Sequence, residues 1–172
     1  MTTTLLITRE DIANYKQISK STFDDVLNQH IKEAQFEDVR PLLGDRLYND
    51  IIENTSNYDD LLNGGVYTDD NNITRTNQGL KAVLVYYTDA RYKMFGSITD
   101  TPFSLVEKLN GNESKPVDYN VKKSLYTMNR QMAYNLWLTV DTYLRATKNA
   151  LYIGYCSNSN QRKSFKIRKI QW

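Results

Sequence analysis

The chain has 172 residues, 40% hydrophobic and 24% charged, which is typical of a soluble globular protein with one core. It contains no run of 18 apolar residues and a single cysteine, Cys156, which excludes a membrane-spanning helix and an intrachain disulfide and favours a cytoplasmic origin. The net charge of +2 is uneven, because residues 1–141 carry 15 Lys and Arg against 20 Asp and Glu, whereas residues 142–172 carry 7 Lys and Arg and no acid.

The first predicted elements are two amphipathic helices. Thr8 is a favourable N-cap, and Asp11 lies in the first turn that follows, where a negative charge is stabilising. Ser21 or Thr22 is the expected cap of the second helix. The apolar residues of that helix recur at steps of three and four, which predicts one buried face: Phe23, Val26, Leu27, Ile31 and Ala34.

Two breaks follow this helix. Pro41 interrupts the helical pattern, and Gly44 is a natural terminator. Asp45 is the expected cap of a further helix, and a short helical piece over residues 58–62 ends at Gly64 and Gly65. We therefore predict a tight corner between short helices.

One segment before the tail has β character. Residues 66–68 and 73–75 flank a turn-rich stretch of Asp and Asn, which predicts a β-hairpin over residues 66–75. We expect this hairpin to project from the body, where four residues would be available to a neighbour or a tail protein: Tyr67, Asp69, Asp70 and Ile73.

The two strongest helical patterns span about 77–95 and 118–146. In the first pattern, one broad face contains Leu80, Val83, Leu84, Tyr87, Ala90, Arg91 and Met94. In the second, a sustained stripe predicts a buried bundle face, with the two methionines as core filler: Val121, Leu125, Met128, Met132, Leu136, Val140, Tyr143 and Leu144. The sequence therefore predicts a mainly α body over residues 1–149.

Residues 150–172 are predicted to form an extended basic arm. Three interpretations are open: a clamp on nucleic-acid phosphates with base stacking, a strand added to an acidic protein surface, or a solubilising tail. Four large apolar residues near its end argue against the tail. The predicted docking residues of the arm are Tyr152, Tyr155, Arg162, Lys163, Phe165, Lys166, Ile167, Arg168, Lys169, Ile170 and Trp172.

Nothing in the sequence supports catalysis. His30 is the only histidine, with no nucleophile motif around it, and we interpret it as a surface or helix-rim residue. One Cys and one His cannot fill a structural zinc site. The Asp69-Asp70 segment lacks the central Gly and closing Glu of a calcium loop, and Gly64-Gly65 lacks the Lys of a phosphate loop. We therefore expect no enzyme, no metal and no cofactor.

The order of these pieces resembles the head–tail connector (head-completion or portal adaptor) proteins of tailed bacteriophages, including short-tailed, Bacteroides-infecting (crAss-like) phages. The matching segments are AQFEDVRPLLGDRLY at 34–48, Tyr58, LLNGG at 61–65, Tyr67, GLK at 79–81 and YYTDAR at 86–91, followed by the long helix and the extended tail. The resemblance covers residues 8–172.

The resemblance implies an antiparallel helical bundle, assembled as a homododecameric ring beneath the portal of the virion. Such a ring would bind the portal protein and a tail or second-ring protein, and would pass DNA non-specifically through an acidic channel. The arm would dock on the portal or on a neighbouring subunit. The protein would be made in the host cytoplasm, without a membrane role. A small nucleic-acid-binding or DNA-packaging accessory protein is the alternative function, and an enzyme ranks third.

Overall fold

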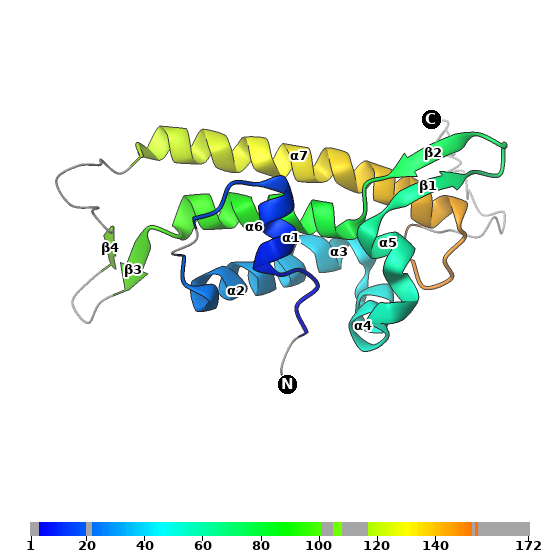
Figure 1. Cartoon of the computed structure of the whole chain (residues 1–172), viewed down its shortest axis with the longest axis horizontal. Coiled ribbons are helices and arrows are strands. Elements are labelled where there is room, and N and C mark those ends of the chain that lie inside the picture. The colour runs from blue at the N-terminus through cyan, green and yellow to red at the C-terminus, as the bar shows by residue number, and fades with distance from the viewer. Residues whose placement is uncertain (1–3, 20–21, 101–104, 108–116, 153, 155–172) are drawn as a thin grey trace, which may run out of the picture.

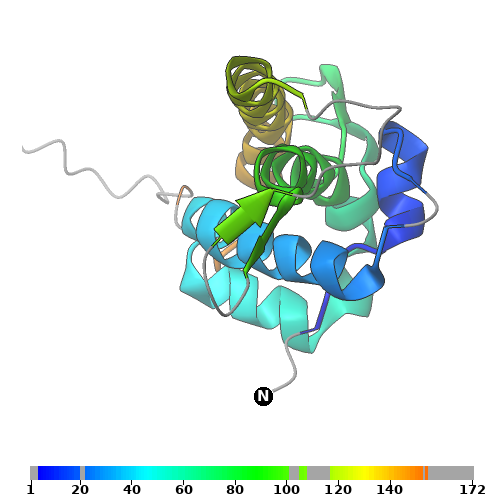
Figure 2. The ribbon, with the colours of Figure 1, turned by 90° about the vertical axis from the view of Figure 1, so that its left-hand side faces the viewer.

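The computed structural model describes residues 4–19, 22–100, 105–107, 117–152 and 154. The protein is mainly helical, as the sequence predicts. Helix α6 (Leu80–Phe95) lies at the centre, with α7 (Tyr119–Ala146) on one side of it and α2 (Asp24–Glu33), α3 (Arg40–Leu43) and α4 (Asp45–Glu53) on the other (Figures 1 and 2). Helices α1 (Arg9–Tyr15) and α5 (Asp59–Asn63) also pack on α6.

Helix α6 is the core of the protein because its first half is apolar nearly all round. Leu80, Val83, Leu84, Tyr87 and Ala90 are buried as predicted, and so are residues on its other faces. A helix that is buried on every side needs neighbours all around it. The remaining helices provide that cover.

The N-terminal helix begins where its cap predicts. Thr8 and Asp11 form a capping box at the start of α1, in which each side chain bonds to the other residue's backbone N–H. The predicted cap of α2 is wrong: this helix begins at Asp24, after Phe23, which provides no side-chain cap. Phe23 is also 72% exposed rather than part of the predicted buried face.

A π-helix, η1 (Ala34–Val39), continues α2 and separates it from α3. Its wider turn points two polar side chains into the protein. Gln35 accepts a hydrogen bond from the Leu6 backbone N–H at 2.8 Å and donates one to the Thr4 carbonyl at 3.1 Å. Asp38 binds arginines from two other helices, as described below. Short π segments of this kind often mark places where a sequence serves a special contact.

The predicted corner is present. Pro41 lies in the first turn of α3, and Gly44 ends that helix with a φ of 81°. Gly44, rather than Asp45, is the N-cap of α4. After η2 (Thr55–Tyr58), α5 ends at Gly64, which lies back to back with Gly79. A Cβ on Gly64 would approach the Gly79 nitrogen to 2.6 Å, so both positions need glycine.

The predicted hairpin is also present, two residues longer at its end than expected. Strand β1 (Gly65–Thr68) pairs antiparallel with β2 (Thr74–Asn77), with Tyr67 opposite Arg75. A second antiparallel pair, β3 (Ile98–Asp100) with β4 (Leu105–Glu107), follows α6. No strand was predicted between the helical patterns at 77–95 and 118–146.

Helix α7 differs from prediction in the face that it buries. Asn129, Ala133, Trp137, Val140 and Leu144 are buried against the body. By contrast, the predicted stripe is largely exposed in its first half: Val121 is 49%, Met128 55% and Met132 42% exposed. The methionines are therefore not core filler. The small Ala133 lets α7 approach its neighbour, and the bulk of Trp137 then fixes which face turns inward.

The packing of Tyr58 gives a prediction on pH. Its hydroxyl donates a hydrogen bond to the Asp50 carboxylate, and burial followed by this bond raises the pKa of Tyr58 to about 12. An unfolded tyrosine titrates near pH 10. The contribution of Tyr58 to stability is therefore complete below pH ~10 and is lost as the pH rises towards ~12.

We expect the free energy of unfolding, measured in urea at pH 8.5 and at pH 11.5, to fall between the two. In Tyr58→Phe this fall should be smaller. An equal fall in the variant and the wild type would show that Tyr58 does not contribute to it.

Candidate interaction surface

The solvent-facing side of α7 is almost free of charge. Twelve residues between positions 120 and 142 are exposed, and Lys123 is the only charged one among them. We call the eleven uncharged ones the outer face of α7: Asn120, Val121, Ser124, Thr127, Met128, Gln131, Met132, Tyr134, Asn135, Leu138 and Thr142.

The outer face of α7 is hollowed at three places along its length. A hollow of about 290 Å³ lies near its start and is lined by Val121, Leu125 and Met128 with two polar neighbours. A second, of about 390 Å³, lies at mid-helix between Tyr126, Tyr134 and their neighbours. Recesses lined by Met and Tyr suit apolar side chains of a protein partner better than a charged substrate.

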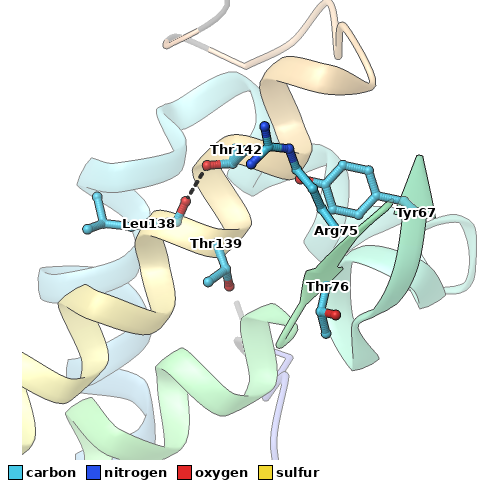
Figure 3. A pocket seen from close by; sticks show the side chains of 6 residues that line it. All are labelled: Tyr67, Arg75, Thr76, Leu138, Thr139 and Thr142. Atoms are coloured by element: carbon cyan, nitrogen blue, oxygen red, sulfur yellow. Dashed lines mark hydrogen bonds between the residues drawn. The ribbon is translucent and has the colours of Figure 1, made fainter. Parts of the chain in front are cut away.

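The third hollow, of about 370 Å³, lies between α7 and the hairpin (Figure 3). Leu138, Thr139 and Thr142 line it from α7, and the strands contribute Tyr67, Arg75 and Thr76. The Thr142 hydroxyl donates to the Leu138 carbonyl at 2.8 Å and is thereby satisfied within the helix. Arg75 is the one charged residue of the six, so this hollow offers no acid–base pair for chemistry.

Two buried polar clusters hold α7 in place. Asp38, whose side chain is 4% exposed, accepts hydrogen bonds from Arg91 of α6 at 2.7 Å and from Arg130 of α7 at 2.6 Å. The buried Asn129 donates to Asp89 of α6 at 2.9 Å and accepts from Lys16 at 3.0 Å. Because each cluster joins α7 to two other segments, the outer face is presented by a helix in a fixed orientation.

The four predicted hairpin contacts divide into two groups. Tyr67 packs edge-on against Tyr143 of α7, with ring centroids 5.1 Å apart. Asp69 closes the turn by accepting from the Asn71 and Ile73 backbone, and its hydrogen bond with Arg75 lowers the pKa of its carboxyl. These two therefore serve the protein's own structure.

The other two hairpin residues face solvent. Ile73 is 49% exposed. Asp70 is exposed as well and pairs with Lys148 at 3.0 Å, which ties the tip of the hairpin to the end of α7. Ile73 is thus the member of the predicted set that remains most available to a partner.

Tyr152, a predicted docking residue of the arm, has a buried side chain and belongs to the body. It is 5% exposed and packs edge-on against Trp137, with the two ring centroids 6.2 Å apart. Its hydroxyl donates a hydrogen bond to Asp141. Burial, followed by that bond, raises the pKa of Tyr152. The chain turns back on α7 after Asn149, so the body extends at least to Tyr152.

The other predicted docking residues of the arm lie outside the described residues: Tyr155, Arg162, Lys163, Phe165, Lys166, Ile167, Arg168, Lys169, Ile170 and Trp172.

His30 is buried rather than at the surface. It is 6% exposed and lies against the Tyr92 ring, and its Nδ1 is hydrogen-bonded to Glu33 Oε2 at 3.2 Å. Within the described part of the chain, no three His, Cys, Asp or Glu side chains gather as they would around a metal ion. No helix among these residues is both long and apolar enough to cross a membrane.

The outer face of α7 was not predicted from the sequence, although a signal was present. From residue 119 to residue 140 the chain contains Lys122, Lys123 and Arg130 but no acid. Exposed helices usually alternate acids and bases at steps of four. The absence of acids over six turns is therefore unusual for a helix face that contacts only solvent, and it indicates a contact with a partner.

One comparison with known proteins gives a match. The family described as "Family of unknown function (DUF6712)" matches residues 39–165, which include α6 and all of α7. No curated protein and no solved structure matches the chain.

Proposed function

We propose that this chain, which belongs to the DUF6712 family of unknown function, is a structural protein of a tailed-phage virion. It would form a ring under the portal, join the portal to the tail and continue the DNA channel. The resemblance of residues 8–172 to head–tail connector proteins supplies the class of assembly. The mainly helical body agrees with that class but is shared by many proteins.

The outer face of α7 carries the proposal. The fully buried centre of a protein interface is depleted of charge and enriched in Tyr and Met. Tyr134, Met128 and Met132 are more than 40% exposed on this face, and the hollows beside them lack acids. Covering such a helix with another protein buries exposed apolar surface and is therefore stabilising, which favours a component of an assembly over a monomeric enzyme.

The decisive experiment is negative-stain imaging of the purified protein, alone and mixed with the portal protein encoded by the same genome. We expect portal particles to gain a ring at one end. In the absence of portal, either a monomer or a ring is compatible with the proposal, because such rings can form on the portal as a template. Portal particles that gain no density at saturating protein would contradict the proposal.

Deletion of residues 157–172 tests the docking arm. We expect the truncated protein to lose portal binding while its far-UV circular dichroism remains helical, because the described helices end at Ala146. Five basic and four large apolar residues would be removed together. Portal binding at full affinity after truncation would show that the arm is not the docking segment.

The nucleic-acid alternative makes a different prediction. A phosphate clamp would bind duplex DNA at low salt, and its affinity would fall steeply as salt is raised. We expect no measurable binding of a 30-base-pair duplex by the full chain at 50 mM salt. Tight, salt-sensitive binding that is lost on deletion of residues 157–172 would instead favour the accessory protein.

A further inference from the structure

Helices α4 and α5 present a surface whose negative charge is largely not neutralised. Residues 44–64, which form α4, η2 and α5, contain five Asp and Glu against a single base, Arg46. Asp45 pairs with Arg40. Among the described residues, no basic side chain forms an ion pair with the other four acids: Asp50, Glu53, Asp59 and Asp60. We call the surface of residues 44–64 the α4–α5 corner.

A separate hollow, of about 190 Å³, lies between the α4–α5 corner and the end of α7. Tyr58, Asp60 and Leu61 line it from the corner, and Tyr143 lines it from α7. Asp60 is the one charged residue in this lining. Burial, followed by the nearby Asp60 charge, raises the pKa of Tyr143. A carboxylate beside tyrosine rings suits a Lys or Arg side chain, whose stem packs on the apolar wall while its charge meets the acid.

The chain's own basic arm begins close to this hollow. Asn149 lines the hollow, and the described chain leaves the body at Gly154, whose carbonyl accepts a hydrogen bond from Arg145 at 2.6 Å. Residues 147–152 lie at the same end of the molecule as α4 and α5 (Figure 1). Since an extended chain spans at most about 3.6 Å per residue, the five residues from Asn149 to Gly154 place the hollow within about 18 Å of Gly154.

The arm has both the charge and the length to reach the hollow. Residues 155–172 carry five Lys and Arg and no acid. The first of these bases, Arg162, follows Gly154 by eight residues, which can extend over about 26 Å. The outer face of α7 is a poorer site for the arm, because it offers no acid and lies beside the exposed Lys123.

We propose that the C-terminal arm, residues 155–172, folds back on the α4–α5 corner of its own chain and places a Lys or Arg side chain in the hollow beside Asp60. The tether favours this intrachain contact, because a linked segment is present at an effective concentration on the order of 1 mM. The contact is autoinhibitory, since a partner that binds the arm has to displace it from the corner. It goes beyond the proposed function and does not require the portal.

Crosslinking within single chains tests the contact. In a Cys156→Ser background, Ser56→Cys beside the hollow is combined with Ser164→Cys in the arm, and a bismaleimide that spans about 10 Å is added. The control pair is Ser124→Cys, on the outer face of α7, with Ser164→Cys. We expect the monomer band to contain the 56–164 crosslink in at least about fivefold excess over 124–164, and to lose that excess when salt is raised from about 50 to 500 mM. Equal yields for the two pairs at low salt, or an excess that salt does not change, would overturn the proposal.

Neutralising the corner tests the autoinhibition, and this test rests on the proposed function. Asp59→Asn with Asp60→Asn should abolish the excess of 56–164 crosslinks and strengthen portal binding by about three- to tenfold, as the fraction of chains with a free arm rises. The matched control is Glu10→Gln with Asp25→Asn, two acids that also lie in the first turn of a helix and have no ion pair among the described residues. Circular dichroism checks that both double variants are folded. Equal portal affinity in the two double variants would overturn the autoinhibition.

The two proposals fail in different ways. If the wild type does not bind portal, the proposed function fails, and the crosslinks between positions 56 and 164 still decide whether the arm lies on the corner. If portal particles gain a ring but the 56–164 crosslinks show no excess, the ring exists and the arm is not held by its own chain.

Discussion

Replacing Asp38 by alanine should lower the free energy of unfolding by about 3 kcal/mol. Breaking a buried ion pair by removing one partner costs about 3–5 kcal/mol, since the remaining charges lose their compensation. Here two arginines would be left without their shared carboxylate. We expect the lower end of the range because the side chain of Arg130 keeps 35% of its exposure, whereas that of Arg91 keeps only 17%.

The matched control is Asp45→Ala, which breaks the exposed pair of Asp45 with Arg40. Water and salt screen a surface pair, so its loss should change stability little, and urea unfolding should separate the two variants clearly. Losses of similar size in both would show that the cluster around Asp38 adds nothing to stability. Asp38→Ala should also alter the surface proposed for assembly, because Arg130, which would lose its partner Asp38, lines the hollow at the middle of α7.

The sequence predicted those features of the fold that depend on neighbouring residues. Thr8 begins α1 because a cap needs only the three residues after it. Gly44 and Gly64 end helices with positive φ angles, and the turn between β1 and β2 follows from its Asp and Asn residues. Each of these signals lies within one segment of the chain.

Features that depend on distant segments were not predictable. The π-helix at η1 is stabilised by arginines more than 50 positions away in the sequence. His30 and Tyr152 look polar and peripheral in the sequence, yet each is buried under a ring from another part of the chain. Periodicity reports which residues share a face but not which face a neighbour covers.

The outer face of α7 shows this limit in one helix. The stripe from Val121 to Met132 is more apolar than the face containing Asn129 and Ala133, and hydrophobicity alone selects the wrong one as core. The polar Asn129 is buried because Lys16 and Asp89 satisfy its amide. An apolar stripe that the monomer leaves exposed is what an assembling protein requires.

Replacing Trp137 by alanine should destabilise the protein by about 3–5 kcal/mol, the usual cost of removing a large buried aromatic side chain. Its ring is 5% exposed and packs between the body and Tyr152, so its loss leaves a cavity under α7 and frees the segment that follows the helix. The neighbouring Leu138 is 46% exposed on the outer face, so Leu138→Ala should change stability by less than about 0.5 kcal/mol. Thermal or urea unfolding of the isolated chain gives both values.

In assembly, the effect of Leu138→Ala should be large although its effect on stability is small. This variant should weaken ring formation on the portal if the outer face of α7 is covered there. A large loss of stability in Leu138→Ala, or none in Trp137→Ala, would mean that the inward and outward faces of α7 have been assigned the wrong way round.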